Sequence, residues 1–134
     1  MTSNVTYKGN LRTTATHLAS GSDLETDAPT DNQGKGERFS PTDLVATALG
    51  SCMMTMMGIK ARDMNLNLEG LHIDISKHMA SDPRRISGID VVLRFPAELT
   101  LEEKEKTILE RAALTCPVFQ SIHPDIVVNT EFRY

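Results

Sequence analysis

The stretch SPTDLVATALGSCMMTMMGIKARD, residues 40–63, decides which fold this sequence predicts. Ser40, Pro41 and Asp43 form the pattern of a capped helix start with proline at the first helical position. We therefore expect one helix from about Pro41 to Asp63. Its side chains are apolar or small nearly all round, so we expect the helix to be buried in a core. Its two apolar stripes are Leu44, Ala48, Cys52, Met56 and Ile59, and Val45, Leu49, Met53 and Met57, and its small side consists of Ala46, Gly50 and Ser51.

The residues before this helix predict strands. Residues 4–17 carry Val, Tyr, Leu and several threonines around Gly9-Asn10, which is typical of a hairpin. Residues 20–29 predict a short polar third strand or an extended loop. Residues 27–38 collect Gly, Pro, Asp and Asn without apolar periodicity, and we expect a loop there.

The residues after the helix alternate between strands and helices. Two strands are predicted at 68–80 and 86–95, and an amphipathic helix capped by Thr100 follows over 99–114. A short helix restarts at Pro117, and residues 125–134 close the chain as a strand. This order predicts an α+β fold, with an antiparallel sheet of about six strands and a long buried central helix.

Composition narrows the classes of function. With 134 residues, the chain predicts a single domain over 1–134. A net charge of −4 gives no electrostatic footprint for nucleic acid or an anionic membrane, so neither is expected as a partner. The first residues lack the pattern of a signal peptide, which makes a cytoplasmic location the expectation. The four histidines are scattered and no zinc-ligand spacing occurs, so no metal site is expected.

The two cysteines are the candidate reactive groups. Two thiols in a reducing compartment are unsuited to a permanent disulfide, and buried cysteines often act only as small apolar residues. Cys116 precedes Pro117 at a predicted helix N-cap, where backbone N–H groups favour a thiolate. Cys52 lies about three turns into its helix among methionines, which favours an unreactive thiol unless a cation reaches it. Local sequence therefore predicts Cys116 as the more acidic thiol.

SPTDLVATALGSCMM, followed by CPV with its cysteine 64 residues after Cys52, resembles the OsmC/Ohr family of thiol-dependent peroxidases. The resemblance implies that Cys52 is oxidised by a hydroperoxide to a sulfenic acid and that Cys116 resolves it as a transient disulfide. It also implies an external dithiol as reductant, lipoyl-type or other, in place of a bound cofactor. An intertwined homodimer with the central helices at its centre is the implied assembly.

The resemblance further implies an arginine near Cys52, paired with a glutamate at the start of the central helix. Arg38 and Arg12 are the candidates for this arginine. The glutamate is absent, because Thr42 follows Pro41 here, and the nearest carboxylates are Asp43 and Glu37. The expected binding residues are Asp43, Thr42, Leu49, Met53 and Met56.

Two functions follow as hypotheses. The first is a peroxidase that reduces organic, lipid-like hydroperoxides in oxidative or osmotic stress defence. The alternative is a redox-sensing or small apolar ligand-binding protein with little peroxidase turnover. Peroxide consumption by the purified protein with a dithiol distinguishes the two.

Overall fold

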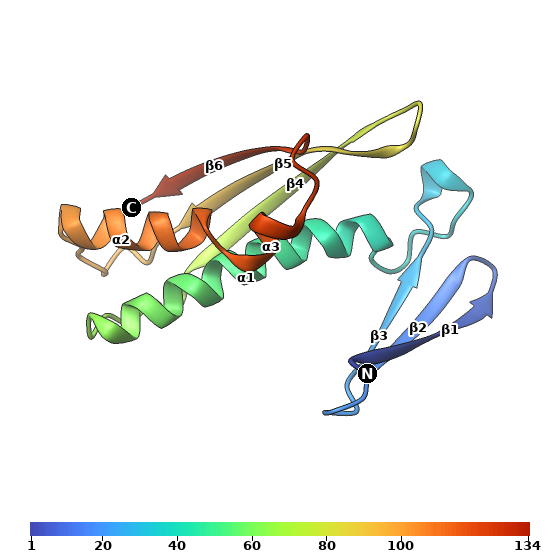
Figure 1. The fold of residues 1–134 in the computed structure, drawn as a ribbon, viewed down its shortest axis with the longest axis horizontal. Helices are drawn as coiled ribbons and strands as arrows, with labels where there is room; N and C mark the ends of the chain where they lie inside the picture. The colour runs from blue at the N-terminus through green and yellow to red at the C-terminus, as the bar shows by residue number, and fades with distance from the viewer. The chain divides into compact units, whose positions relative to one another are not determined.

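The computed structural model describes residues 1–134, which form two compact units, Met1–Val45 and Ala46–Tyr134 (Figure 1). Each unit contains its own three-stranded sheet, in the orders β1-β2-β3 and β4-β5-β6. The α+β class and the six strands are therefore confirmed, but the strands form two sheets instead of one. The expectation of a single domain over 1–134 stays a prediction.

The first unit is built on an antiparallel meander of β1 (Ser3–Gly9), β2 (Arg12–His17) and β3 (Asp23–Asp27). The predicted hairpin turn is present, with positive φ values of 53° at Asn10 and 61° at Leu11. Two successive left-handed residues suit the twist of a tight hairpin. The segment predicted as strand or loop pairs along β2 as a strand. The loop that follows contains one short 3-10 helix, η1 (Thr30–Asn32).

Helix α1 (Pro41–Asp63) has the predicted bounds because its start is fixed locally. The Ser40 backbone N–H donates to Asp43 Oδ2 at 2.9 Å, and the Asp43 backbone N–H donates to Ser40 Oγ at 3.1 Å. These reciprocal bonds are a capping box, which satisfies backbone donors that the first turn leaves without helical partners.

One face of α1 is buried in the core, as expected, whereas other apolar side chains of the helix are left partly exposed by a single copy. Val45 and Ile59 remain 39% and 47% exposed. On the small side, a Cβ added to Gly50 would lie 2.5 Å from Ile75 Cδ1, so glycine allows the helix to approach β4 closely. The buried residues are Ala46, Leu49, Gly50, Met53, Met57 and Ala61.

By length and composition, α1 also meets the criterion for a membrane-crossing helix, with a mean hydropathy of 1.4. A helix that lies in the core of a globular protein meets the same criterion. Here Leu49, Met53 and Met57 are fully buried among side chains of the second unit's core. The apolar character of this face of α1 is thus accounted for by packing.

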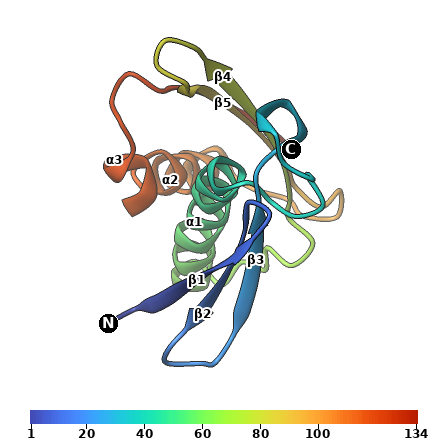
Figure 2. The same cartoon turned by 90° about the vertical axis from the view of Figure 1, so that its right-hand side faces the viewer.

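The second unit's sheet contains β4 (His72–Ala80), β5 (Arg85–Arg94) and β6 (Val127–Arg133). β4 and β5 are antiparallel, whereas β5 and β6 are parallel, which corrects the prediction of wholly antiparallel pairing. A parallel neighbour requires a crossover connection, and α2 (Glu103–Leu114) and α3 (Pro117–Ser121) provide it. Figure 2 shows these helices on one side of the sheet.

Helix α2 starts three residues later than its predicted cap. The Glu105 carboxylate accepts the Glu102 backbone N–H at 2.8 Å, and the Glu102 side chain in turn accepts the backbone N–H of Glu105. The N-cap is therefore Glu102, and the prediction of Thr100 as the cap is wrong. The sequence also offers Thr100 with Glu103 at its third helical position, and the structure uses the alternative pair Glu102 and Glu105.

The core of the second unit joins α1, the sheet and α2. Ile89, Val91 and Leu93 on β5 are fully buried and meet the buried face of α1 in one cluster. Leu109 and Ala113 of α2 belong to the same cluster. Cys116 also lies in this cluster with no exposed surface, so one of the two thiols is part of the core.

Candidate functional site

The two thiols are neighbours in the second unit. Cys52 is half-buried on α1 and packs against the core cluster that contains Cys116, the N-cap of α3. Cys52 lies close enough to Cys116 to contribute to the raised pKa of the Cys116 thiol. Both cysteines are free thiols. The fold therefore brings together two sulfurs that are 64 residues apart in the sequence.

The prediction from local sequence that the helix N-cap makes the Cys116 thiol acidic is wrong. The N-cap geometry is present, since the Phe119 backbone N–H donates to Cys116 Sγ at 3.5 Å. Burial nevertheless raises the pKa of the Cys116 thiol, and the bond from Phe119 offsets this only in part. Loss of hydration disfavours the thiolate more than one peptide N–H favours it. Cys116 is thus protonated at neutral pH, and Cys52 is the more accessible of the two thiols.

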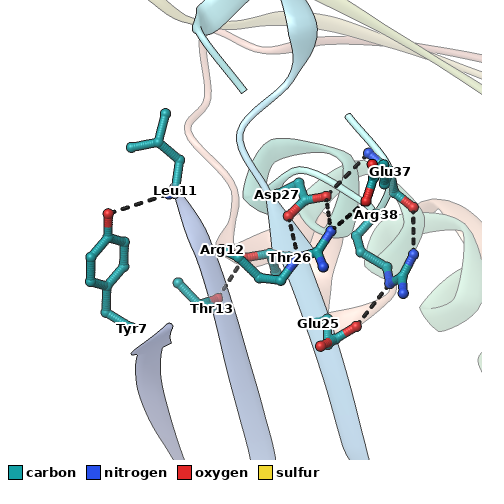
Figure 3. A network of polar contacts seen from close by, with 9 residues as sticks. All are labelled: Tyr7, Leu11, Arg12, Thr13, Glu25, Thr26, Asp27, Glu37 and Arg38. Carbon is teal, nitrogen blue, oxygen red and sulfur yellow. Dashed lines mark hydrogen bonds and ion pairs between the residues drawn. The ribbon is translucent and has the colours of Figure 1, made fainter. Parts of the chain in front are cut away.

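Arg12 is held by two carboxylates in the first unit (Figure 3). Its Nε and Nη2 groups donate to the two oxygens of Asp27 at 2.7 and 2.8 Å, and Nη2 also donates to Glu37 Oε2 at 2.9 Å. Asp27 is only 1% exposed, whereas the Glu37 side chain is 58% exposed. The hydrogen bonds from Arg12 lower the pKa of the Asp27 carboxyl, which is therefore ionised at neutral pH. The same bonds raise the pKa of Arg12 above its usual value.

Arg38 makes a looser set of contacts. Its Nε donates to Glu25 Oε2 at 2.9 Å, and its Nη1 donates to the backbone oxygen of Glu37 at 3.0 Å. Both side chains of the Arg38–Glu25 pair are exposed. Such pairs are weakly held, because water competes for both charges. Of the two candidate arginines, Arg12 is the one that a buried carboxylate fixes in place.

Sequence reasoning missed Asp27. The signal that would have found it is cross-strand register, since Arg12 on β2 pairs directly with Asp27 on β3. Opposite charges on directly paired residues attract each other on the face of a sheet. In the sequence, residues 20–29 were compatible with either a strand or a loop. Without an assigned strand there, the pairing of Arg12 with Asp27 could not be predicted.

Thr42 and Asp43, which lie where the family resemblance implies a glutamate, make local contacts at the start of α1. Asp43 is part of the capping box, and Thr42 Oγ1 lies 3.2 Å from Ser40 Oγ. Of the two carboxylates that the sequence left open, Glu37 accepts a hydrogen bond from the side chain of Arg12.

The expected apolar binding residues differ in exposure. Leu49 and Met53 belong to the core and have no exposed surface, whereas Met56 is partly buried at the edge of the core.

A separate groove of about 320 Å³ lies along α2, beside Lys60 of α1. It contains none of the predicted site residues, although Thr115 at its edge directly precedes Cys116. Its lining consists of Lys60, Thr107, Ile108, Arg111, Ala112 and Thr115. No cluster of three or more His, Cys, Asp or Glu side chains that could hold a metal ion is present.

Comparisons with known proteins agree with this arrangement. The family model described as OsmC-like protein matches residues 34–131, which include both cysteines. A solved structure from Psychrobacter arcticus 273-4, named for an osmotic stress and detoxification response, is 52% identical with a TM-score of 0.95. It covers 99% of this chain and 96% of its own. A comparison with curated proteins found no match.

Two solved structures of lower identity share the fold. An organic hydroperoxide resistance protein OsmC from Legionella pneumophila is 14% identical with a TM-score of 0.77, covering 100% of this chain and 98% of its own. The organic hydroperoxide resistance protein OhrB of Bacillus subtilis is 19% identical with a TM-score of 0.68, covering 99% and 98%. With the family model matching most of the sequence, the chain belongs to the OsmC-like protein family.

Proposed function

We propose that this protein is a thiol-dependent peroxidase that reduces organic hydroperoxides carrying an apolar substituent. The observation that carries the proposal is the pairing of a half-buried thiol, Cys52, with a fully buried and protonated one, Cys116. Because Cys52 is the more accessible thiol, it is suited to attack a hydroperoxide. Because Cys116 is buried, it is protected from direct oxidation and remains available to react with the oxidised Cys52. The names of the Legionella and Bacillus relatives, which refer to organic hydroperoxide resistance, support the same chemistry.

The reaction has two steps on the protein. The Cys52 thiolate attacks the terminal oxygen of ROOH, the O–O bond breaks, and the alkoxide takes a proton to leave as the alcohol ROH. Sulfur is oxidised and the peroxide is reduced, which leaves Cys52 as a sulfenic acid. The Cys116 thiol then attacks this sulfur, so that the Cys52–Cys116 disulfide forms and water leaves. An external dithiol reduces the disulfide and is itself oxidised.

A reactive thiolate requires a nearby cation, and Arg12 and Arg38 remain the candidates that the family resemblance implies. Of the two, Arg12 is the more firmly held, because the buried Asp27 fixes its orientation. Asp43 is assigned to helix capping and not to the reaction. Met56 is assigned to the contact with the apolar part of the substrate, because it is the only one of the three expected apolar residues that is not fully buried.

The proposed partners and location follow the family. We propose a lipoyl-type or similar dithiol as reductant, no bound cofactor, a cytoplasmic location and a role in oxidative or osmotic stress defence. A homodimer is supported by apolar side chains that one copy leaves exposed. Among them are Val5 and Tyr7, both more than 60% exposed, and Ile59 on α1.

The test is consumption of cumene hydroperoxide by the purified, reduced protein with dihydrolipoamide in excess. We expect steady turnover in the wild type and none in Cys52→Ser. Cys116→Ser should consume about one equivalent per subunit and then stop, because the sulfenic acid has no resolving thiol. One equivalent consumed by the wild type, without turnover with any dithiol, would favour the redox-sensing alternative.

A further inference from the structure

We propose that the groove between α1 and α2 binds a medium-chain alkyl carboxylate, with Lys60 and Arg111 as the charged contacts of its head group. This inference goes beyond the proposed function, since neither thiol takes part in it. All residues that line the groove belong to the second unit, in which Figures 1 and 2 both show α2 beside α1.

The lining of the groove is positively charged in a chain of negative net charge. It contains two cations, Lys60 and Arg111, and no carboxylate, although the chain carries a net charge of −4. Glu110, which precedes Arg111 in the sequence, is engaged elsewhere, because its Oε1 accepts the Tyr134 hydroxyl at 2.7 Å. Two cations that share one concave surface favour an anionic ligand there.

Both cations are available to a ligand. The Arg111 side chain makes no hydrogen bond or ion pair in the structure. Lys60 has one ion pair, to Asp63 at 3.9 Å, and both side chains of this pair are exposed. Such a pair is weakly held, so the Lys60 ammonium can turn toward another anion at little cost. The planar guanidinium of Arg111 presents parallel N–H groups that match the two oxygens of a carboxylate.

The two threonines of the lining do not supply donors. Thr107 Oγ1 donates to the Glu103 backbone oxygen at 2.9 Å, and Thr115 Oγ1 donates to the Arg111 backbone oxygen at 2.7 Å. Each hydroxyl has one hydrogen, and both hydrogens are used within the helix. The side-chain donors left for a ligand are therefore the two charged groups, which favours a carboxylate over a neutral acceptor.

The rest of the groove favours an alkyl chain of limited length. Ile108 and Ala112, one turn apart on α2, give the lining an apolar part that gains from being covered. At a rise of about 1.5 Å per residue, Thr107 and Thr115 lie about 12 Å apart along α2. The volume of about 320 Å³ is at the lower end of the range for ligand sites. An inorganic anion would leave the apolar part uncovered, so we commit to a medium-chain carboxylate.

The experiment is a titration of the full-length reduced protein with sodium octanoate, followed by amide chemical shifts in ¹H–¹⁵N NMR spectra. The neutral ligand of the same chain length is 1-octanol. We expect the largest shifts within residues 107–115, and octanoate should bind at least about fivefold more tightly than 1-octanol. Higher salt should weaken the binding of octanoate and leave that of 1-octanol unchanged.

The variants separate charge recognition from apolar contact. Arg111→Gln and Lys60→Gln should each weaken octanoate binding by about three- to tenfold and change 1-octanol binding by less than about twofold. Lys104→Gln is the matched control, because it removes one positive charge from an exposed residue of α2 that does not line the groove. It should change octanoate binding by less than about twofold.

Three results would overturn the proposal: no binding of octanoate to the wild type, equal affinity for octanoate and 1-octanol, or unchanged octanoate affinity in Arg111→Gln. Both substituted side chains are exposed, so the variants should fold, and their amide spectra show this directly. Failure of the proposed function is distinct, since absent peroxide turnover would leave these affinities and their response to the variants unchanged.

Discussion

Replacing Leu49 with alanine tests whether this residue belongs to the core or to a substrate-binding surface. Leu49 has no exposed surface, and it lies among buried side chains of α1, β5 and α2. The substitution removes three buried carbon atoms, which at about 0.8 kcal/mol each gives about 2.4 kcal/mol for the transfer to water. The cavity left behind adds to this, so we expect a loss of about 3–4 kcal/mol in the free energy of unfolding.

The assay is urea denaturation followed by circular dichroism, with the same slope m expected for both proteins. Leu114→Ala is the control, because it removes the same atoms from a side chain that is 40% exposed, and it should cost about 1 kcal/mol or less. A loss below about 1 kcal/mol for Leu49→Ala, combined with a raised KM for a hydroperoxide, would refute the core assignment.

Three further predictions follow from the fold. Gly50→Val should destabilise the protein by about 1–3 kcal/mol in urea denaturation, because its side chain would collide with Ile75; a neutral effect would mean that α1 does not approach β4 closely. Asp74→Asn should lower stability at pH 7 but converge with the wild type in acid. The Arg94 bond depresses the folded pKa of Asp74, so its contribution is complete above the unfolded value of about 3.9 and is lost as pH falls through the folded pKa. Urea denaturation at several pH values checks this, and a constant difference down to pH 2 would contradict it. Light scattering should give the mass of a dimer, and a stable monomer would contradict the assembly that we propose.

Local chemistry could be predicted from the sequence, whereas tertiary contacts could not. The bounds of α1 followed from Ser40 and Asp43, because a capping box depends on four consecutive residues. β6 pairs parallel to β5 because the crossover through α2 and α3 returns the chain to the same end of the sheet. The residue pattern of β6 itself does not indicate this direction.

The site shows the same limit. The N-cap position of Cys116 was predicted, but its burial was not, and burial decides the direction of its pKa. The Arg12–Asp27 pair depends on the register of two strands, one of which the sequence left ambiguous. The order of the two thiols that we propose comes from the family resemblance, whereas local sequence predicted the opposite order.

The most direct measurement of the central claim is peptide mapping after treatment of the reduced protein with one equivalent of cumene hydroperoxide and alkylation of the remaining thiols. Because the chain has two cysteines, the account predicts that both escape alkylation together and appear in one peptide linked between Cys52 and Cys116, with two hydrogens lost from the intact mass. In Cys116→Ser, dimedone should trap a sulfenic acid at Cys52. Full alkylation of both cysteines after the peroxide, or a disulfide found only between separate chains, would contradict the claim that these two thiols form one redox pair.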